Sequence, residues 1–444
     1  MVKLQLPRGM RDYPPEEKLL REELVSALKE TFERYGFNPI ETPIVERFEV
    51  LAAKYGGGEE ILKETFRLRD QGGRELGLRY ELTTSLARFI GMNPTLKRPF
   101  KAYQIGPVFR DGPIKRGRLR QFWQCDVDTI GTKSMLAEAE LLSLALDFFS
   151  QLGLEVEIKV NNRKLLRDLI EPEASLLAAR GLDPISIILS LDKLEKLGRE
   201  GVAAELRGKG LEEEEIARLI ELSEVEGTNE ERLAALRGRV ESAGLDELEE
   251  LFRYLDGPEK ERIVFTPSLA RGLAYYTGTV FEVFLADGSF EGSLAAGGRY
   301  DDLIGQFLGT GEEIPAVGIS FGLEPIAEVY LEREKRGLRR GGKPPARSVA
   351  EVYVIPIGPT AIKGFEVAQQ LRRAGIKADM DLMGRGVSAN LEYANAYGIP
   401  YVLLLGPEEL AQGKVKLRDM ASGREELLTL KEAIAKVAQP PLAR

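Results

Sequence analysis

The chain has 444 residues, which is more than one hydrophobic core usually organises, so two or three domains are expected. Hydrophobic residues make up 43% of it, as in ordinary globular proteins, and no transmembrane or signal segment is expected. It contains no histidine, which excludes acid–base catalysis and metal binding by histidine. Its single cysteine, Cys125, excludes an internal disulfide and a metal site made of several thiolates. The net charge of −9 excludes binding to nucleic acid through overall charge, so any such binding needs a local basic surface.

The N-terminal part is expected to begin with a helix and to continue as a strand. Asp12 offers a side-chain acceptor, and the prolines that follow it suit the first turn of a helix. Apolar residues then recur every four positions until Gly36: Leu20, Leu24, Leu28 and Phe32. Residues 37–46 (FNPIETPIVE) are expected to be extended. Because two prolines there cannot donate a backbone hydrogen bond, this strand belongs at a sheet edge or a subunit boundary.

The middle of the chain alternates between strand-rich and helical segments. Residues 65–131 are strand-rich, with a hairpin turn at Gly72 and Gly73, and residues 134–152 form a strongly apolar helix. Residues 163–256 change to short amphipathic helices with charged faces, which indicates an insertion domain. Within it, Glu212–Glu215 are expected to be a solvated first turn that the helix dipole favours.

Strand patterns resume at residue 263 and run to about 326. A basic linker rich in glycine and proline follows at 332–348. The remaining residues alternate strand, helix, helix, strand. This pattern predicts a final α/β unit with a small, largely parallel sheet.

The segment 103–131 carries the first candidate site. Two alternating strands flank a loop with four basic residues: Lys115, Arg116, Arg118 and Arg120. Gln124 and Asp128 lie four apart on the second strand and share a face with Phe122, which could stack on a planar base. Arg110 ends the first strand. This face offers a guanidinium for phosphate or carboxylate, and an amide and a carboxylate for an ammonium group; a basic hairpin with ordinary cross-strand pairs is the alternative.

Three further stretches are ambiguous when taken singly. In LGLRYELTTSLARF (76–89), Glu81 and Thr83 alternate onto one side of an extended segment, where such residues usually face solvent. RGLAYYTGTVFE (271–282) has an arginine and two tyrosines on a turn flanked by glycines. The same pattern also suits the ordinary start of a strand. SLAAGGRYDDLIG (293–305) has two glycines that allow a close approach of backbone or ligand, or a plain tight turn.

Taken together, five stretches resemble the histidyl-tRNA synthetases of class II in their order and spacing, over nearly the whole chain. They are the opening PRGMRDYPP, then GFNPIETPIVE, VFRDGPIKRGRLRQFWQ, RGLAYYTG and AAGGRYDDL. The resemblance implies an α+β fold, with an antiparallel-sheet catalytic core, a helical insertion and a C-terminal α/β anticodon-binding domain. The implied domains are the core in 1–162 and 257–331, the insertion in 163–256, a linker in 332–349 and the anticodon-binding domain in 350–444. L-histidine, ATP with Mg²⁺ and a histidine-specific tRNA are the implied partners. A cytoplasmic homodimer without membrane attachment is also expected.

The same resemblance assigns roles motif by motif. The implied catalytic residues are Arg110 and Arg271, which stabilise charge as the carboxylate of histidine attacks ATP. The implied histidine-binding residues are Glu81, Thr83, Arg110, Gln124, Asp128, Arg271, Tyr275 and Tyr276. The implied ATP-binding residues are Arg110, Arg118, Arg120 and Phe122. No general base is needed, because a carboxylate is already nucleophilic, so a chain without histidine can catalyse by positioning and electrostatics.

Among the departures from the family pattern, two concern the proposed substrate sites. Ala274 stands where an aspartate is frequent, which loosens the surroundings of the histidine pocket. Pro325 stands where the third class II motif commonly ends in an arginine for the γ-phosphate of ATP. A non-catalytic paralogue that senses histidine, of the kind that serves as regulatory subunit of ATP phosphoribosyltransferase, therefore stays open, although it generally lacks the C-terminal domain. A binding module with a decayed active site also stays open, but the intact set of polar residues argues against it.

Overall fold

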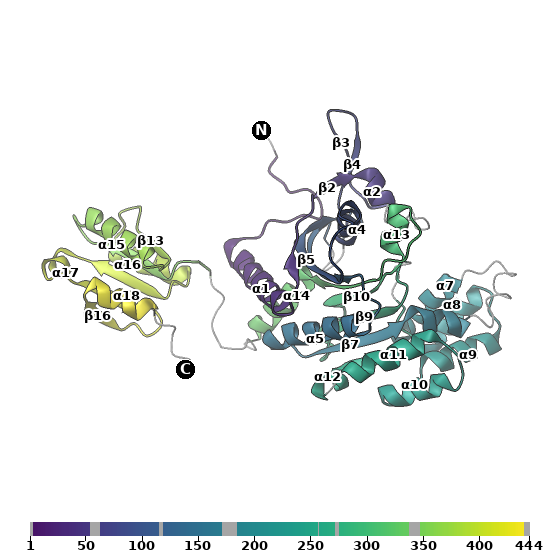
Figure 1. Ribbon diagram of the computed structural model, residues 1–444. Helices are drawn as coiled ribbons and strands as arrows, with labels where there is room; N and C mark the ends of the chain where they lie inside the picture. Colours follow the sequence, from purple (N-terminus) through teal and green to yellow (C-terminus); the bar gives the residue numbers. More distant parts are fainter. Residues whose placement is uncertain are drawn as a thin grey trace. The chain divides into compact units, whose positions relative to one another are not determined.

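The computed structural model of the chain describes residues 3–53, 63–114, 119–170, 184–255, 257–270, 275–336 and 347–438. The chain divides into two compact units (Figure 1). One is built on an eight-stranded sheet and the other on a five-stranded sheet within residues 352–428. None of the helices that the structure describes is both long enough and apolar enough to span a membrane.

The eight-stranded sheet is antiparallel except at its two edges. Its strands, in spatial order, are β1 (Asn38–Pro39), β5 (Phe100–Phe109), β6 (Gln121–Ile130), β11 (Ala316–Gly322), β10 (Ala295–Arg299), β9 (Thr279–Leu285), β7 (Val156–Asn162) and β8 (Ile263–Phe265). The edge strands β1 and β8 run parallel to their neighbours β5 and β7. The segment 37–46 is not one strand, because it contains β1 and the start of β2 (Val45–Arg47), which belongs to another sheet. The edge position expected from its prolines is confirmed for β1, which has one neighbour in this sheet.

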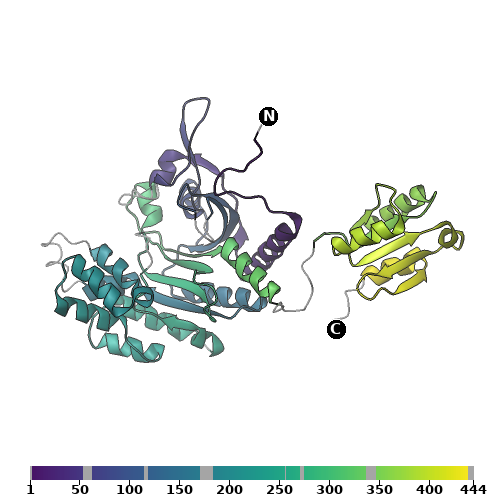
Figure 2. The ribbon, with the colours of Figure 1, turned by 180° about the vertical axis from the view of Figure 1, so that it is seen from behind.

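Helices pack against both faces of this sheet (Figure 2). Outside the insertion, the part of residues 3–336 that the structure describes includes the helices α1 (Pro15–Arg34), α2 (Phe48–Ala53), α4 (Thr83–Met92), α5 (Leu136–Gln151), α13 (Leu303–Leu308) and α14 (Leu323–Lys335). Phe321 of β11 packs against Phe32 of α1 at 5.6 Å and against Phe148 of α5 at 5.4 Å between ring centroids. Phe321 is the register partner of Cys125 on β6, and both are fully buried, so the core lies on this face. The opposite face carries the polar residues of β6, and α4 and α13 pack against its apolar residues Ile130 and Ala316.

A smaller sheet joins three short strands: β2 (Val45–Arg47), β4 (Glu75–Leu78) and β3 (Arg67–Arg69). β3 and β4 are antiparallel, and Gly73 in their connection has φ of +77°. The predicted hairpin turn is therefore confirmed, and its conformation is one that glycine adopts without strain.

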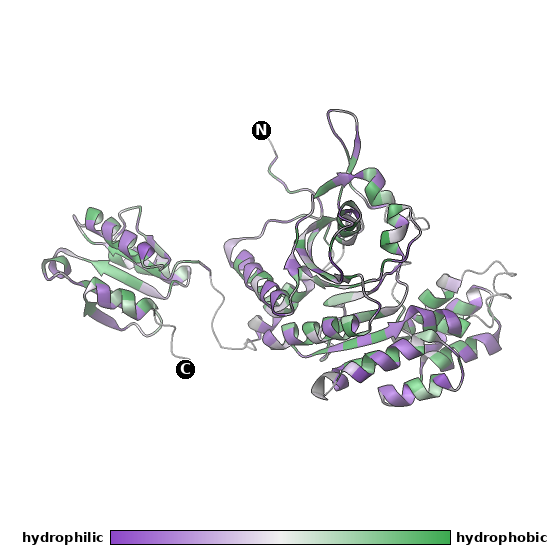
Figure 3. Ribbon diagram, viewed as in Figure 1, coloured by the Kyte–Doolittle hydropathy of each residue, from purple (hydrophilic) through white to green (hydrophobic). Residues whose placement is uncertain are grey.

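After the helical residues 163–170, the described part of the insertion includes the helices α7 (Pro184–Leu191), α8 (Leu194–Gly208), α9 (Glu213–Ser223), α10 (Asn229–Arg237), α11 (Ala243–Tyr254) and α12 (Gly257–Arg262). Their apolar faces turn inward and their charged faces outward, as the colours in Figure 3 show. Glu212 precedes α9 and forms a capping box with Glu215, so the acidic run is the first turn that the sequence predicts.

The second unit is a mixed sheet with helices. Its strands, in spatial order, are β13 (Ala378–Met380), β12 (Val352–Pro356), β14 (Tyr401–Leu405), β15 (Val415–Asp419) and β16 (Glu425–Leu428). Its helices are α15 (Ala361–Arg373), α16 (Val387–Ala396), α17 (Pro407–Ala411) and α18 (Leu430–Ala438). The prediction of a largely parallel sheet holds for β13, β12 and β14, which pair in parallel, but β15 and β16 add two antiparallel pairs. Antiparallel strands need only short connections, and these fit between residues 406 and 425.

Three local predictions also need correction. Glu81 and Thr83 do not alternate along a strand, because Thr83 begins helix α4. The apolar residues that follow lie at helical spacing, which favours the helix. The glycines of AAGGRY lie within strand β10 rather than in a tight turn. Helix α14 also extends to Lys335, into the segment expected as a linker.

Candidate active site

Polar side chains on β6 form the floor of the candidate site. Gln124, Asp126 and Asp128 alternate onto the sheet face opposite Phe321 and its helices. Gln124 Nε2 donates to Ser320 Oγ at 3.1 Å. Its Oε1 is buried and has no hydrogen-bond partner among the described residues. A buried oxygen without a donor is costly, so this atom suits a ligand that brings one, such as an ammonium group.

Asp128 is held in place by a tyrosine and by a glycine. The hydroxyl of Tyr300 donates to Asp128 Oδ1 at 2.6 Å. Burial and the neighbouring charge of Asp128 raise the pKa of Tyr300 well above its ordinary value, so the phenol remains a proton donor at neutral pH. A Cβ on Gly318 would lie 1.9 Å from the same oxygen, so only glycine leaves room for the carboxylate.

The two tyrosines of RGLAYYTG lie together beside this carboxylate. The ring centroids of Tyr275 and Tyr276 are 4.5 Å apart, and Tyr275 meets Tyr300 edge-on at 6.1 Å. Tyr276 belongs to the same apolar cluster as Tyr300 and residues of helix α4, which begins at Thr83. The structure thus brings helix α4, the tyrosine pair and the partner of Asp128 into one region.

The glycines of β10 permit this arrangement. A Cβ on Gly298 would lie 2.9 Å from the ring of Tyr276 and 2.5 Å from the carbonyl oxygen of Thr279. A Cβ on Gly297 would lie 2.1 Å from the carbonyl oxygen of Gly318. These positions are therefore glycine because backbone and aromatic ring approach closely.

Arg110 directly follows β5, on the same face of the β5–β6 hairpin as Phe122, and lies next to Glu81. Its guanidinium is 5.0 Å from the ring centroid of Phe122, and its Nε donates to the carbonyl oxygen of Tyr80 at 3.0 Å. Glu81 follows Tyr80 directly, is buried, and accepts a hydrogen bond from Thr84 Oγ1 at 2.5 Å. Arg110, Phe122 and Glu81 are therefore neighbours although they are distant in sequence.

Arg120 is the one predicted cation of the hairpin loop within the described residues. It forms an ion pair with Asp111 at 2.8 Å and donates from Nε to the carbonyl oxygen of Gly112 at 3.2 Å. Its backbone N–H donates to the carbonyl oxygen of Gly9 at 2.8 Å. These contacts hold Arg120 at the base of the loop. Arg118, Arg271 and Ala274 lie outside the described residues.

Pro325 occupies the first turn of α14, where its fixed φ suits a helix start. A Cβ on Gly322 would lie 2.7 Å from Pro325 Cγ, so the ring packs directly on the end of β11. The adjacent Glu324 accepts from the backbone N–H of Trp123 at 3.0 Å. The start of α14 is therefore fixed to β6 without a cation at position 325.

Three residues of the site escaped the sequence analysis: Asp126, Tyr300 and Gly318. The alternation that pointed to Gln124 and Asp128 also includes Asp126, so this signal was available. Tyr300 lies in a motif that was noted only for its glycines. The role of Gly318 depends on the register between β6 and β11, which the sequence does not reveal.

The described residues contain no group of three or more histidine, cysteine, aspartate or glutamate side chains that could hold a metal ion. The carboxylates of the site are instead engaged with neighbouring donors, as for Glu81 and Asp128. The geometry thus offers a cation-binding floor on β6, an aromatic wall, and a guanidinium at Arg110. Together these can position a zwitterionic amino acid beside a phosphate group.

Comparison with known proteins gives the family. The model for histidyl-tRNA synthetase matches residues 9–326, and the model for the anticodon-binding domain matches residues 351–439. Histidine–tRNA ligase 1 of Bacillus cereus is 45% identical over 422 residues, which cover 94% of this chain and 93% of the relative. Histidine–tRNA ligase of Aeropyrum pernix is 39% identical over 440 residues, which cover 97% of each chain. The crystal structure of histidyl-tRNA synthetase from a Nostoc species superposes with a TM-score of 0.83 at 29% identity, covering 98% of this chain and 99% of that one. The chain belongs to the histidyl-tRNA synthetase family.

Proposed function

We propose that this chain activates L-histidine with ATP and transfers the histidyl group to a histidine-specific tRNA. The observation that carries the proposal is the match to both family models, catalytic and anticodon-binding, in a single chain whose relatives are named histidine–tRNA ligases. The polar floor and the tyrosine wall support it, because they suit a zwitterionic amino acid with an aromatic side chain.

The reaction has two steps. A carboxylate oxygen of histidine attacks the α-phosphorus of ATP, the bond to pyrophosphate breaks, and histidyl-adenylate forms. A terminal ribose hydroxyl of the tRNA then attacks the carbonyl carbon, loses its proton, and displaces AMP. In the first step Arg110 and Arg271 would stabilise the charge on the α-phosphate.

Histidine recognition is assigned to two groups of residues. Gln124 and Asp128 would bind the α-ammonium group, and the buried, unpartnered Gln124 Oε1 supports this role. Glu81, Thr83 and the tyrosine pair would recognise the imidazole, since a carboxylate and hydroxyls can pair with both ring nitrogens.

ATP is assigned to Arg110, Arg118, Arg120 and Phe122. Mg²⁺ would enter as the counter-ion of the triphosphate, with phosphate oxygens and water as its main ligands. The ion pair of Arg120 with Asp111 leaves Arg118 as the better candidate to meet the γ-phosphate. We further propose a cytoplasmic homodimer, built partly through residues 37–46, since β1 offers a free sheet edge.

One observation favours a second function. Pro325 removes the arginine expected for the γ-phosphate, which suits a paralogue that senses histidine without using ATP. The anticodon-binding domain argues for the ligase, because a histidine sensor has no need of it.

Exchange of pyrophosphate into ATP, measured with each of the twenty amino acids, tests the proposal. We expect exchange to depend on histidine and to be lower with glutamine or asparagine by a factor on the order of 10⁴, because those side chains leave polar groups of the pocket unpaired. Equal exchange with another amino acid would end the histidine assignment. Absence of exchange at millimolar ATP would favour the sensor.

A further inference from the structure

The segment 266–270 joins two hydrophobic clusters immediately before the RGLAYYTG motif. Leu269 packs in the cluster that contains Tyr276 and residues of helix α4. The next residue, Ala270, is fully buried in a different cluster, which is formed mainly by α7, α8 and α9 of the insertion. This short stretch of backbone is therefore a point at which the insertion meets the candidate active site.

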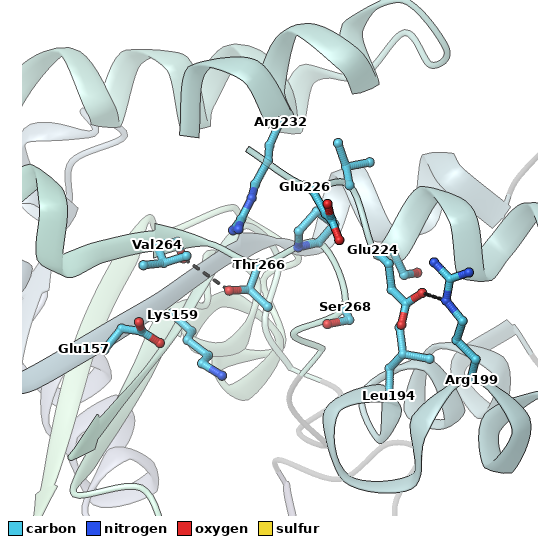
Figure 4. A pocket seen from close by; sticks show the side chains of 13 residues that line it. Glu157, Lys159, Leu194, Arg199, Glu224, Glu226, Arg232, Val264, Thr266 and Ser268 are labelled. Carbon is cyan, nitrogen blue, oxygen red and sulfur yellow. Dashed lines mark hydrogen bonds and ion pairs between the residues drawn. The ribbon is translucent and has the colours of Figure 1, made fainter. Parts of the chain in front are cut away.

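Part of the segment lies beside a cavity. Residues 266–268 and Leu194 of α8 line this cavity, whose volume is about 500 Å³ (Figure 4). Where a cavity lies beside the chain, packing from that side cannot hold it in place. Hydrogen bonds do so instead, because Asn161 Nδ2 donates to the carbonyl oxygens of Pro267 and Leu269, both at 2.8 Å.

Charged side chains bind both polar backbone groups of Ala270. Its N–H donates to Asp192 Oδ1 at 2.7 Å, and its carbonyl oxygen accepts from Arg163 Nη1 at 3.2 Å. Asp192 lies between α7 and α8 of the insertion, whereas Arg163 directly follows β7 of the sheet. Burial lowers the pKa of the Arg163 guanidinium, and the charge of Asp192 opposes this shift. Because both partners are ionised, these hydrogen bonds are about twice as strong as neutral ones.

The other end of the motif is held by different bonds. The backbone N–H of Arg163 donates to the carbonyl oxygen of Gly278 at 2.8 Å. The backbone N–H of Thr277 donates to the carbonyl oxygen of Arg299 at 2.9 Å. Neither bond involves Asp192, so the end of the motif that carries the two tyrosines is fixed independently of this carboxylate.

We propose that Asp192 is a positioning residue for Arg271, through which the insertion sets the rate of adenylate formation. Arg271 follows Ala270 directly in the sequence. Because a peptide unit is planar and rigid, bonds to both polar groups of Ala270 fix the direction in which the chain leaves this residue. The inference rests on the proposed function, in which Arg271 stabilises charge on the α-phosphate, and such stabilisation depends on the exact placement of the donor.

Pyrophosphate exchange by Asp192 variants of the full chain tests the proposal. Asp192→Leu removes the acceptor, and we expect it to lower kcat about 10- to 100-fold, the cost of a misplaced catalytic group. The KM for histidine should change less than about threefold, since the tyrosines are held at the other end of the motif. Asp192→Asn keeps an oxygen that can accept from Ala270, so its kcat should stay within about threefold of the wild type. Because Asp192 is exposed, we expect both variants to fold.

A double-mutant cycle tests whether Asp192 acts through Arg271. Arg271→Ala removes the group that is to be positioned, so the addition of Asp192→Leu should lower kcat no further. Glu205→Gln is the matched control, because it weakens the contact of α8 with Ser190 and Lys193 but leaves the bond from Ala270 to Asp192 in place. It should leave kcat unchanged.

An unchanged kcat in Asp192→Leu, or additive effects in the cycle, would overturn the proposal. So would an equal loss of kcat in Asp192→Asn or in Glu205→Gln, because the loss would then not depend on the acceptor oxygen.

Hydrogen–deuterium exchange, measured by mass spectrometry on the peptide that contains Ala270, checks the contact without catalysis. The amide of Ala270 should exchange at least about tenfold faster in Asp192→Leu than in the wild type, and an unchanged rate would overturn the contact. If the wild type shows no pyrophosphate exchange, the proposed function fails and with it the role of Asp192 in the reaction, whereas faster deuterium exchange in the variant would still establish the contact.

Discussion

Gly318 has no side chain, yet it decides where the carboxylate of Asp128 can lie. A Cβ at this position would come within 1.9 Å of Asp128 Oδ1, so Gly318→Ala must displace the carboxylate and break its bond to Tyr300. We expect the KM for histidine to rise roughly 10- to 100-fold, the effect of losing a charge-assisted hydrogen bond, with the KM for ATP little changed. Exchange kinetics measure both constants.

Gly208→Ala is the matched control, because no atom lies within 4 Å of a Cβ there. It should behave as the wild type. A Gly318→Ala enzyme with an unchanged KM for histidine would show that Asp128 does not bind the substrate ammonium.

A second prediction at this scale concerns Pro325. If Arg118 compensates for the missing arginine, Arg118→Gln should raise the KM for ATP about tenfold and leave the KM for histidine unchanged. Pro325→Arg should lower the KM for ATP, and in that background Arg118→Gln should hardly change the KM for ATP. A double-mutant cycle measures this coupling. Additive effects of the two changes would contradict compensation.

The sequence revealed the site residues unevenly. Gln124 and Asp128 could be placed on one face because the period of a strand is two. Glu81 and Thr83 were predicted on a strand, because a short segment before a helix does not show where the helix begins. Gly318 could not be found, since its role arises from register between strands far apart in the chain.

Among the secondary-structure elements, α5 and β10 are joined by a buried ion pair. Arg299 donates to both oxygens of Glu138, at 2.6 and 2.7 Å, and both side chains are almost inaccessible to solvent. Removing one partner by Glu138→Leu should therefore destabilise the first unit by about 3 kcal/mol, the lower end for a broken buried pair, because Arg299 stays buried but keeps Asp301 as an anionic partner at 3.2 Å. The double variant Arg299→Met with Glu138→Leu should be more stable than Glu138→Leu. Thermal unfolding measures the difference, and a single variant that melts as the wild type would contradict the argument.

The stability of the packed helices α7 and α8 should fall at acidic pH. Glu205 accepts hydrogen bonds from Lys193 at 2.7 Å and from Ser190 at 2.9 Å, and these contacts lower its pKa to about 2 from an ordinary value of 4.5. A carboxyl with a lowered pKa in the folded state stabilises it fully above pH 4.5 and loses this effect as the pH falls towards 2. The difference in melting temperature between the wild type and Glu205→Gln should thus be largest near pH 7 and shrink below pH 4.5. Glu214→Gln, at an exposed carboxylate of α9, should show no such trend.

Elements with a strong local pattern were predictable and those fixed by pairing were not. The apolar spacing of α1 and the prolines of β1 gave a helix and an edge strand that the structure confirms. The direction of β15 and β16 was missed, because short strands with many charged residues carry a weak pattern and their pairing is tertiary.

For the whole molecule, the division into two compact units separates two tasks of the proposed reaction. The proposed histidine and ATP residues all lie in the first unit, and the anticodon-binding model matches residues 351–439 of the second. A tRNA that contacts both units would bind more tightly because the units are linked, since the second contact becomes intramolecular once the first has formed.

A chain that ends at Gly342 should therefore keep histidine-dependent pyrophosphate exchange and lose charging of tRNA. The kcat/KM for tRNA should fall roughly 10²- to 10⁴-fold, the usual gain from linking two binding modules, while the KM for histidine and for ATP stay the same. Supplying residues 347–444 as a separate chain is the control, and it should not restore charging, because the linkage and not the mere presence of the domain provides the gain. If the shortened chain charges tRNA as well as the whole one does, the second unit has another task. If it loses exchange as well, the two units are not independent, and the proposed histidine site needs the second unit to form.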